Sequence, residues 1–440
     1  MAMTGDALQI SGRLGRTLHL RRADPEAPVT VRSREPLVYM LCEAAELEHS
    51  LMCAYLYAAL SLKRSTTEGV TEAQLEAINR WRTAILGVAK QEMLHLAISA
   101  NLLASLGASP HLTKPNLPQP SKHYPTGVTL ALLPFGERAL RHFLFMERPE
   151  GVAMDDAEGL AAMQHAVPHT GAEDLAPHLQ EFSTVGHLYR SIAQGMTHLC
   201  ELWGEERLFL CGHEEEASGA LFGWPELVPI TGLQAALASI ETIVEQGEGV
   251  AGAWRSAHFG RFLDVLSEYS DMRAADKSFE PARPVLPALV RPPLSGEPAV
   301  LITDARTARI ADVCNVSYEV LLQLLYRLFS RVDETEAQVQ TLADVAVSMM
   351  FDAVEPLGDL LTRLPVGAEH PGRTAGPTFE LFYEPDYLLP HRRAAWIVTA
   401  EHLTLAAEVL ESETEALPEV APIAAALRGH ASVLESSALG

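Results

Sequence analysis

The chain has 440 residues and a formal net charge of −24, and 48% of its residues are hydrophobic and 20% are charged. This is the composition of a globular protein with one large or two to three modest domains, and the negative charge excludes a non-specific nucleic-acid binder. The N-terminal MAMTGDALQISGRLGR lacks the apolar core of a signal peptide, and no apolar run approaches the roughly 18 residues that span a bilayer, so we expect a cytoplasmic protein without membrane segments.

Helical patterns dominate the chain, which predicts an all-α fold. An N-terminal arm, residues 1–36, holds two alternating stretches, TLHLRR and VTVRS, that suit a small hairpin. A bundle is expected over 37–275, with helices at about 37–63, 71–107, 137–147, 156–166, 179–203, 231–249 and 259–272. A Pro-rich linker over 276–310 and a C-terminal helical region over 311–440 follow. The long Pro-rich connection at 108–135 is of the kind that covers a site.

Polar residues replace apolar ones in the middle of two predicted helical seams. The first seam, at alternating spacings of four and three, contains Leu41, Ala45, Glu48, Met52, Tyr55 and Ala59. The second contains Ile78, Trp81, Ile85, Val88, Glu92, His95, Ser99 and Leu102. A buried carboxylate without a partner is costly, so Glu48 and Glu92 need one.

A bound metal ion is one such partner. Glu92 and His95 stand one helical turn apart, so both side chains can reach the same ion. With Glu48 from the neighbouring helix they would form half of a di-metal carboxylate site of the kind built in helical bundles. The alternative is a structural hydrogen-bond network among the same three residues. Tyr55, seven residues after Glu48, is a candidate catalytic residue, as a hydrogen-bond donor or a redox-active group, or else an ordinary core tyrosine.

Ligands for a second ion are sought in the second half of the bundle. On the predicted 179–203 helix, a polar stripe makes His187 a candidate ligand, and Glu181 on the opposite stripe is a second candidate. The alternative for His187 is a solvated or hydrogen-bonded histidine. The stretch ASIETIVEQGEGVAGAWRSAHFGRF adds Glu245, Glu248 and His258. Periodicity places Glu248 nearer the core than Glu245. The alternative for this group is an exposed helix end.

Two motifs, LCEAAELEHSLMCAYLYAALSLK and QEMLHLAISANLLASLGASPHL, closely resemble the bacterial ferritin-like domain family associated with the imine-dimer synthase of violacein biosynthesis. STVGHLYRSI, IVEQGEG, AHFGRF, EPLGDLLTRLP and TAGPTFELF look like later landmarks of this family. The resemblance runs in patches from about residue 37 to 382 and implies a ferritin-like four-helix bundle. It also implies metal-binding positions at Glu48, Glu92 and His95, with Glu245 and His258 near the same cavity.

The chain departs from this pattern on the predicted 179–203 helix, which would be the third helix of the four-helix bundle. Near RSIAQG the resemblance leads us to expect an acidic residue, and Ala193 stands there instead. The second metal position is therefore expected to be weakened, to be ligated unusually by His187, or to be absent.

These features favour an oxygen-dependent oxidoreductase with iron in a di-iron or mixed di-metal centre, because carboxylates suit the hard, higher-valent ions that O₂ activation creates. The expected partners are O₂ and a small organic substrate, and the resemblance implies bacterial secondary metabolism. The alternatives are metal storage or peroxide detoxification, for which a compact bundle would suffice, and a non-catalytic helical scaffold with an acidic surface for partners. Association into a homo-oligomer is left open.

Overall fold

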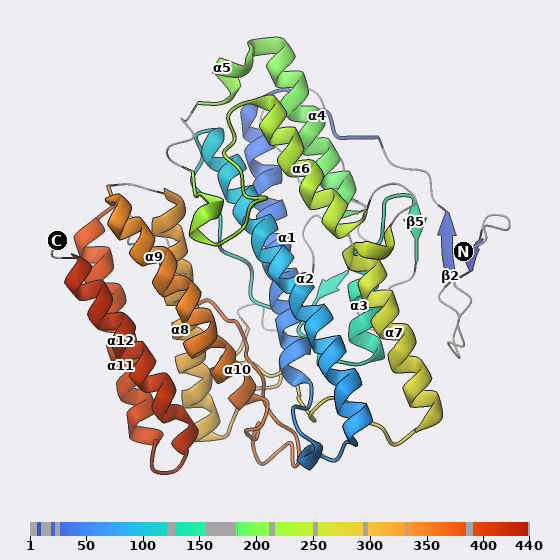
Figure 1. The fold of residues 1–440 in the computed structure, drawn as a ribbon, viewed down its shortest axis with the longest axis vertical. Coiled ribbons are helices and arrows are strands. Elements are labelled where there is room, and N and C mark those ends of the chain that lie inside the picture. Colours follow the sequence, from blue (N-terminus) through green and yellow to red (C-terminus); the bar gives the residue numbers. More distant parts are fainter. Residues whose placement is uncertain are drawn as a thin grey trace. The chain divides into compact units, whose positions relative to one another are not determined.

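The computed structural model describes residues 7–9, 19–22, 27–120, 128–154, 182, 184–210, 216–249, 254–293, 298–330, 333–383 and 390–438. Helices dominate these residues, which confirms the all-α prediction (Figure 1). The helix predicted at 156–166, the start of the 179–203 helix with the candidate ligand Glu181, and much of the 1–36 arm lie outside the described residues. No described helix combines the length and the apolar character needed to cross a bilayer.

The chain divides into two compact units. The first consists of Met1–His111, Pro118–His213 and Val228–Ala282, and the second of Leu112–Leu117, Glu214–Leu227 and Arg283–Gly440. The first unit contains α1 (Arg34–Ser61), α2 (Glu72–Ser105), α3 (Glu137–Met146), α4 (Val185–Trp203), α5 (Glu205–Leu208), α6 (Leu233–Gly247) and α7 (His258–Ala275), with the 3-10 turns η1 (Thr66–Glu68) and η4 (Trp254–Ser256). Its most extensive helix pair is α1 with α2, and α4 packs on α6 while α3 packs on α7.

Short strands accompany the helices of the first unit. β1 (Ala7–Gln9) pairs antiparallel with β2 (His19–Arg22), which pairs in turn with β5 (Val152–Ala153). A second ribbon joins β3 (Gln119–Pro120) to β4 (Thr129–Leu130). These strands are too short to form a core of their own, so the helices carry the packing.

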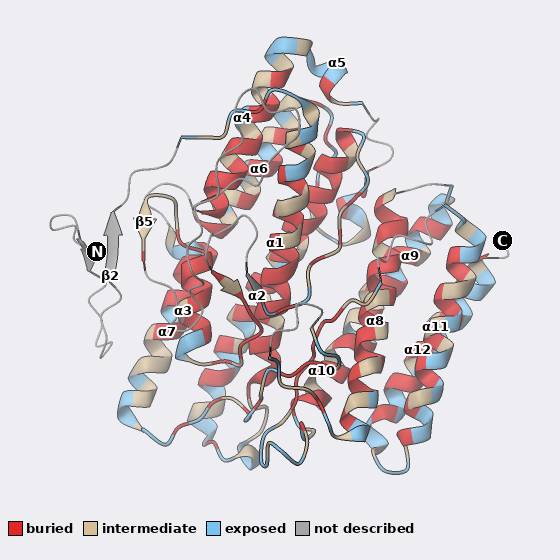
Figure 2. Ribbon diagram, turned by 180° about the vertical axis from the view of Figure 1, so that it is seen from behind, coloured by how far each residue is buried: buried red, intermediate tan, exposed pale blue. Residues whose placement is uncertain are grey.

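The two seams predicted for α1 and α2 are buried at every position named above, which confirms both. Figure 2 shows buried residues along most of α1 and along the second half of α2. The start of α2 is fixed by a capping box, in which Gln74 N donates to Thr71 Oγ1 at 3.2 Å and Thr71 N donates to Gln74 Oε1 at 2.8 Å. Gly107, with φ of 82°, follows its end in the left-handed region.

The second unit is built on α8 (Ala305–Ser330), which packs against α9 (Glu336–Met349) and α11 (Arg392–Glu413). It also contains α10 (Glu355–Leu361), α12 (Ala421–Ala438), the π-helix η5 (Met350–Val354) and the 3-10 turns η3 (Gly219–Leu221) and η6 (Pro418–Val420). α11 and α12 form its most extensive helix pair. The buried Arg327 donates to Glu334 and lies 3.2 Å from Asp333 Oδ1, which ties the end of α8 to the turn before α9.

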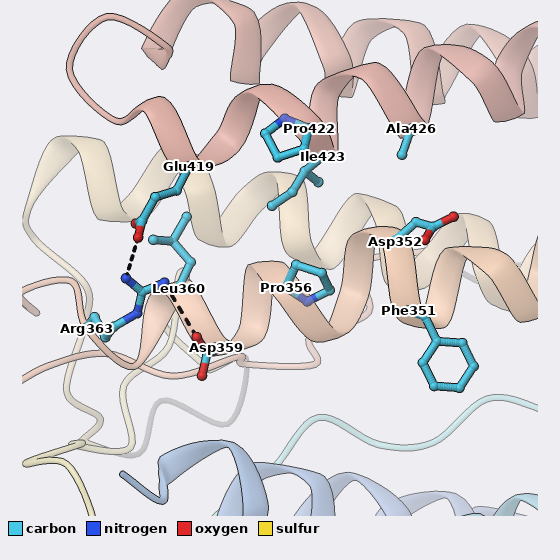
Figure 3. A pocket seen from close by; sticks show the side chains of 10 residues that line it. All are labelled: Phe351, Asp352, Pro356, Asp359, Leu360, Arg363, Glu419, Pro422, Ile423 and Ala426. Atoms are coloured by element: carbon cyan, nitrogen blue, oxygen red, sulfur yellow. Dashed lines mark hydrogen bonds and ion pairs between the residues drawn. The ribbon is translucent and has the colours of Figure 1, made fainter. Parts of the chain in front are cut away.

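A cavity of about 360 Å³ opens in the second unit between α10 and the start of α12 (Figure 3). Arg363 pairs there with Glu419 at 2.7 Å and with Asp359 at 3.4 Å. Pro356, Leu360, Phe351, Asp352, Pro422, Ile423 and Ala426 complete its lining. The lining includes neither histidine nor cysteine, so this cavity does not offer the ligand set predicted for the metal centre.

Candidate metal centre

Five residues of the first unit converge in its interior, and none of these residues is more than 3% exposed. Glu48 comes from α1, and Glu92 and His95 come from α2. Glu147 is the C-cap residue that follows Met146 at the end of α3, and His258 is the first residue of α7. Together these five residues form what we call the carboxylate–histidine cluster.

Glu92 stands at the middle of the carboxylate–histidine cluster. Its Oε2 lies 3.0 Å from His95 Nδ1, and its Oε1 lies 2.9 Å from His258 Nδ1. Glu48 Oε2 lies 3.5 Å from the same nitrogen of His95, and Glu147 Oε2 lies 3.4 Å from the same nitrogen of His258. The cluster therefore consists of two halves, each with one histidine and one outer carboxylate, and Glu92 belongs to both.

Contacts outside the cluster orient its histidines. His95 Nε2 lies 3.1 Å from Gln246 Oε1, so a proton on Nε2 leaves Nδ1 with a lone pair toward the carboxylates. On α7, Arg261 Nη1 donates to Gln91 Oε1 at 2.7 Å, which holds the first turn of α7 against α2. This contact keeps His258 opposite Glu92.

Charge and burial shift the ionisation of the whole cluster. Burial, reinforced by the neighbouring Glu92, raises the pKa of the Glu48 carboxyl to about 7. Burial would also raise the pKa of Glu92, but the facing imidazoles, His258 foremost, bring it below its usual value. Burial favours a neutral His258 ring, yet Glu147 and Glu92 raise its pKa to about 9. The pKa of His95 is likewise raised well above its usual value, by Glu92 and Glu48 against the effect of burial.

The residues present fit a pair of metal ions. Glu48, Glu92 and His95 offer ligand atoms that all lie within 4.8 Å of one another, and so do Glu92, Glu147 and His258. Neither ring nitrogen of the fully buried His258 has a hydrogen bond of good geometry among the described residues, although Nδ1 faces Glu92. A buried ring of this kind is costly unless a ligand occupies it. Carboxylate and imidazole donors suit iron, manganese and zinc.

His187 is not brought into the cluster. Its Nε2 lies 3.1 Å from the carbonyl oxygen of Ala27, and its ring packs edge-on against Phe182. Ser191, one turn further along α4, accepts a hydrogen bond from Val29 N at 3.1 Å. His187 and Ser191 on the polar stripe of α4 therefore contact the segment that precedes α1, and the structure does not bring them to the carboxylate–histidine cluster.

Glu245 and Glu248 are also placed away from the cluster. Glu245 is exposed on α6. Glu248 is buried, but its carboxylate accepts from Gly186 N at 2.6 Å and from Glu150 N at 2.9 Å. A Cβ atom on Gly186 would collide with this carboxylate, so the close approach requires glycine there. The structure therefore does not bring Glu245 or Glu248 to the cluster, and Glu248 joins the end of α6 to the start of α4.

The buried carboxylate of Glu248 makes a testable contribution to stability. Burial raises its pKa from 4.5 to about 7, so between these pH values the folded chain binds more protons than the unfolded chain. The contribution of Glu248 to the free energy of unfolding therefore falls as the pH rises, by roughly 3 kcal/mol between these two pH values. We expect Glu248→Gln to remove this fall in urea unfolding measured at pH 5 and pH 8. Glu245→Gln, on the exposed face of the same helix, is the control and should retain it; an unchanged pH dependence in Glu248→Gln would contradict the assignment.

Three contact residues escaped the sequence prediction. Glu147 follows the apolar FLFM at the end of a short helix, and this polar break after a buried run was the available signal. Gln246 stands between the two glutamates that were singled out. Tyr189 lies on the apolar face of α4, and its hydroxyl donates to Glu48 Oε1 at 2.7 Å.

Tyr55, which the sequence predicts as a candidate catalytic residue, donates to Glu147. Burial raises the pKa of both tyrosines well above the usual value, with the adjacent carboxylates adding to the rise.

A family model described as Ferritin-like matches residues 41–267, which is more than half of the chain. The chain belongs to the ferritin-like family. The matched range includes every residue of the carboxylate–histidine cluster. The prediction of a ferritin-like bundle is therefore confirmed.

Two relatives extend this result. The chain is 26% identical over 406 residues to the dichlorochromopyrrolate synthase of Lentzea aerocolonigenes, and 27% identical over 386 residues to the 2-imino-3-(indol-3-yl)propanoate dimerase of Chromobacterium violaceum. These matches confirm the resemblance to the violacein-associated family. They cover 84% and 81% of this chain but only 38% and 35% of the two relatives. A ferritin like protein of known structure from Caulobacter vibrioides is 19% identical, with a TM-score of 0.43 over 72% of this chain and 96% of that chain.

Proposed function

We propose that the chain is a ferritin-like oxidoreductase that holds two metal ions, of which iron is our assignment, and uses O₂ on a small organic substrate. The observation that carries the proposal is the position of Glu92, whose two oxygens face two different histidines at 3.0 and 2.9 Å. A carboxylate in this position would offer one ligand oxygen to each half, and glutamate and histidine side chains likewise supply the ligands of the di-metal carboxylate proteins. The outer carboxylates, Glu48 and Glu147, would each complete one half.

The chemistry assigned to the residues follows from their placement. Iron ions, when bound, supply Lewis-acid and redox chemistry toward O₂. His95 and His258 would bind through Nδ1, and Gln246 fixes the orientation of the His95 ring through Nε2. The near-complete burial of the five ligands excludes bulk water, which strengthens their electrostatic hold on a cation. Tyr55 contacts a ligand and not an open surface, so we assign it a role in holding Glu147.

The relatives support the class of substrate. One is named for the synthesis of dichlorochromopyrrolate and the other for the dimerisation of an indolyl imino acid. Both names describe small organic molecules, which supports an enzyme of bacterial secondary metabolism over a storage protein. The chain spans about two-fifths or less of either relative, so the coupling reactions in those names are not assigned to it.

Oxygen consumption tests this function. The chain is loaded with Fe(II) under argon, freed of excess iron and mixed with aerated buffer while dissolved O₂ is recorded. We expect rapid uptake of O₂ by the wild-type chain and no uptake above the buffer rate by His95→Ala. A storage protein would instead take up many irons per chain, and a scaffold would retain none.

Metal loading is also expected to release protons. Without metal, the raised pKa of His258, about 9, and that of His95 keep both imidazoles protonated at neutral pH. Because a metal ion must displace such a proton, affinity should rise with pH between 6 and 8, by up to about tenfold per unit for each imidazole. Calorimetric titration in two buffers of different ionisation enthalpy counts the protons. Metal binding with no proton release would contradict the assigned ligands.

A further inference from the structure

Two buried tyrosines hold the two ends of the carboxylate–histidine cluster. Tyr189 on α4 donates from its hydroxyl to Glu48 Oε1 at 2.7 Å, and Tyr55 on α1 donates to Glu147 Oε1. Both tyrosine side chains are fully buried. In each outer carboxylate, the phenol therefore occupies one oxygen, while the other oxygen faces a histidine, at 3.5 Å for Glu48 and 3.4 Å for Glu147.

The central carboxylate is held differently. Both oxygens of Glu92 face histidines, at 3.0 and 2.9 Å. A hydrogen bond to one oxygen of a carboxylate fixes its rotation and directs its other oxygen toward a metal ion. The outer carboxylates are therefore set to offer one oxygen each, and Glu92 is set to offer both.

We propose that Tyr189 and Tyr55 are positioning residues, each serving one half of the metal centre: Tyr189 orients Glu48 for the half that contains His95, and Tyr55 orients Glu147 for the half that contains His258. This inference rests on the proposed metal centre. Because each outer carboxylate has its own tyrosine, metal binding by one half can be weakened without affecting the other half.

The two tyrosines are fixed by different contacts. Ser99 Oγ lies 3.1 Å from the hydroxyl of Tyr189, which extends the hydrogen-bonded chain from α2 through α4 to Glu48 on α1. Tyr55 packs instead between aromatic rings, with its centroid 4.7 Å from that of Phe143 and 4.9 Å from that of Phe262. In both cases the ring packing survives a change to phenylalanine, so Tyr→Phe removes the hydroxyl alone.

The test measures each half in isolation, with Co(II) as the probe. Glu147→Gln leaves the Glu48 half intact, and Glu48→Gln leaves the Glu147 half. In the first background we expect Tyr189→Phe to weaken Co(II) binding on the order of tenfold or more, and Tyr55→Phe to change it less than about twofold. In the second background the two effects should exchange. If circular dichroism shows that a Gln background does not fold, His258→Ala and His95→Ala isolate the same halves.

Tyr269→Phe is the matched control. This tyrosine lies on α7, the helix of His258, and packs edge-on against Trp81 and Phe135 instead of the cluster. It should leave Co(II) binding unchanged in both backgrounds. The positioning roles would be overturned if either Tyr→Phe change weakened Co(II) binding equally in both halves, or if neither change weakened it. The proposed function would still stand in that case, provided that the wild-type chain binds two ions. A wild-type chain that binds no Co(II) would overturn both.

Discussion

Glu92→Ala is expected to abolish the binding of both metal ions while leaving the helical content of the chain largely intact. Glu92 is the one cluster residue whose oxygens face both histidines, so its loss removes a ligand from each half at once. The fold should persist, because the α2 seam keeps its buried apolar residues on both sides of the polar positions, among them Val88 and Leu102. Elemental analysis and circular dichroism of the purified variant measure the two effects.

The control for this variant is Glu76→Ala, which removes an exposed carboxylate from the same helix. Its metal content should equal that of the wild-type chain. If Glu92→Ala retained both ions, Glu92 would not be the shared ligand. If it retained one ion, the two halves would be independent sites and not one bridged centre.

Glu147→Ala is expected to leave one tightly bound ion and to weaken the binding of the second. The loss of affinity for the second ion should exceed the roughly 10–100-fold that is typical when a residue contacting a ligand is changed. The remaining half, with Glu48 and His95, does not contain Glu147. His187→Ala is the matched comparison, because His187 is equally buried but bonds to the carbonyl of Ala27. It should leave both ions in place.

Titration of the metal-free variants with Fe(II) under argon separates these results. The wild-type chain and His187→Ala should each show two binding steps, and Glu147→Ala one. Loss of a binding step in His187→Ala would show that His187 on α4 is a metal ligand. Two unchanged steps in Glu147→Ala would remove Glu147 from the centre.

Helical period accounts for what the sequence could predict. Residues in the middle of a long amphipathic helix have their direction set by 3.6-residue geometry, and α1 and α2 are long enough to show it. Glu48, Glu92 and His95 lie in mid-helix, so their convergence followed from two seams and one packing partner. The capping residues Thr71 and Gln74 likewise act within a single turn.

Helical periodicity could not predict the direction of side chains at the ends of helices. Glu147 caps the C-terminal end of α3, and His258 begins α7, so the docking of α3 on α7 determines where each of them points. Near the end of α6 the sequence favoured Glu245 and Glu248, yet Gln246 reaches the cluster. A shift of one or two positions is about 100–200° of rotation on a helix, and only the packing of α6 on its neighbours fixes it.

The absence of an acidic residue at Ala193 also has a structural explanation. The prediction of a weakened second position assumed that α4 must supply the second outer carboxylate. In the structure Glu147 Oε2 lies 3.4 Å from His258 Nδ1, and α4 contributes Tyr189, whose hydroxyl donates to Glu48. An isolated position such as Ala193 cannot reveal a replacement that comes from another helix.

Anomalous diffraction from crystals of the full chain soaked in Fe(II) under argon would locate any iron ions bound at the carboxylate–histidine cluster. We expect two iron peaks, one among Glu48, Glu92 and His95 and the other among Glu92, Glu147 and His258. A cluster region without anomalous density, in crystals where the soaked iron is detected elsewhere, would contradict the proposed metal centre.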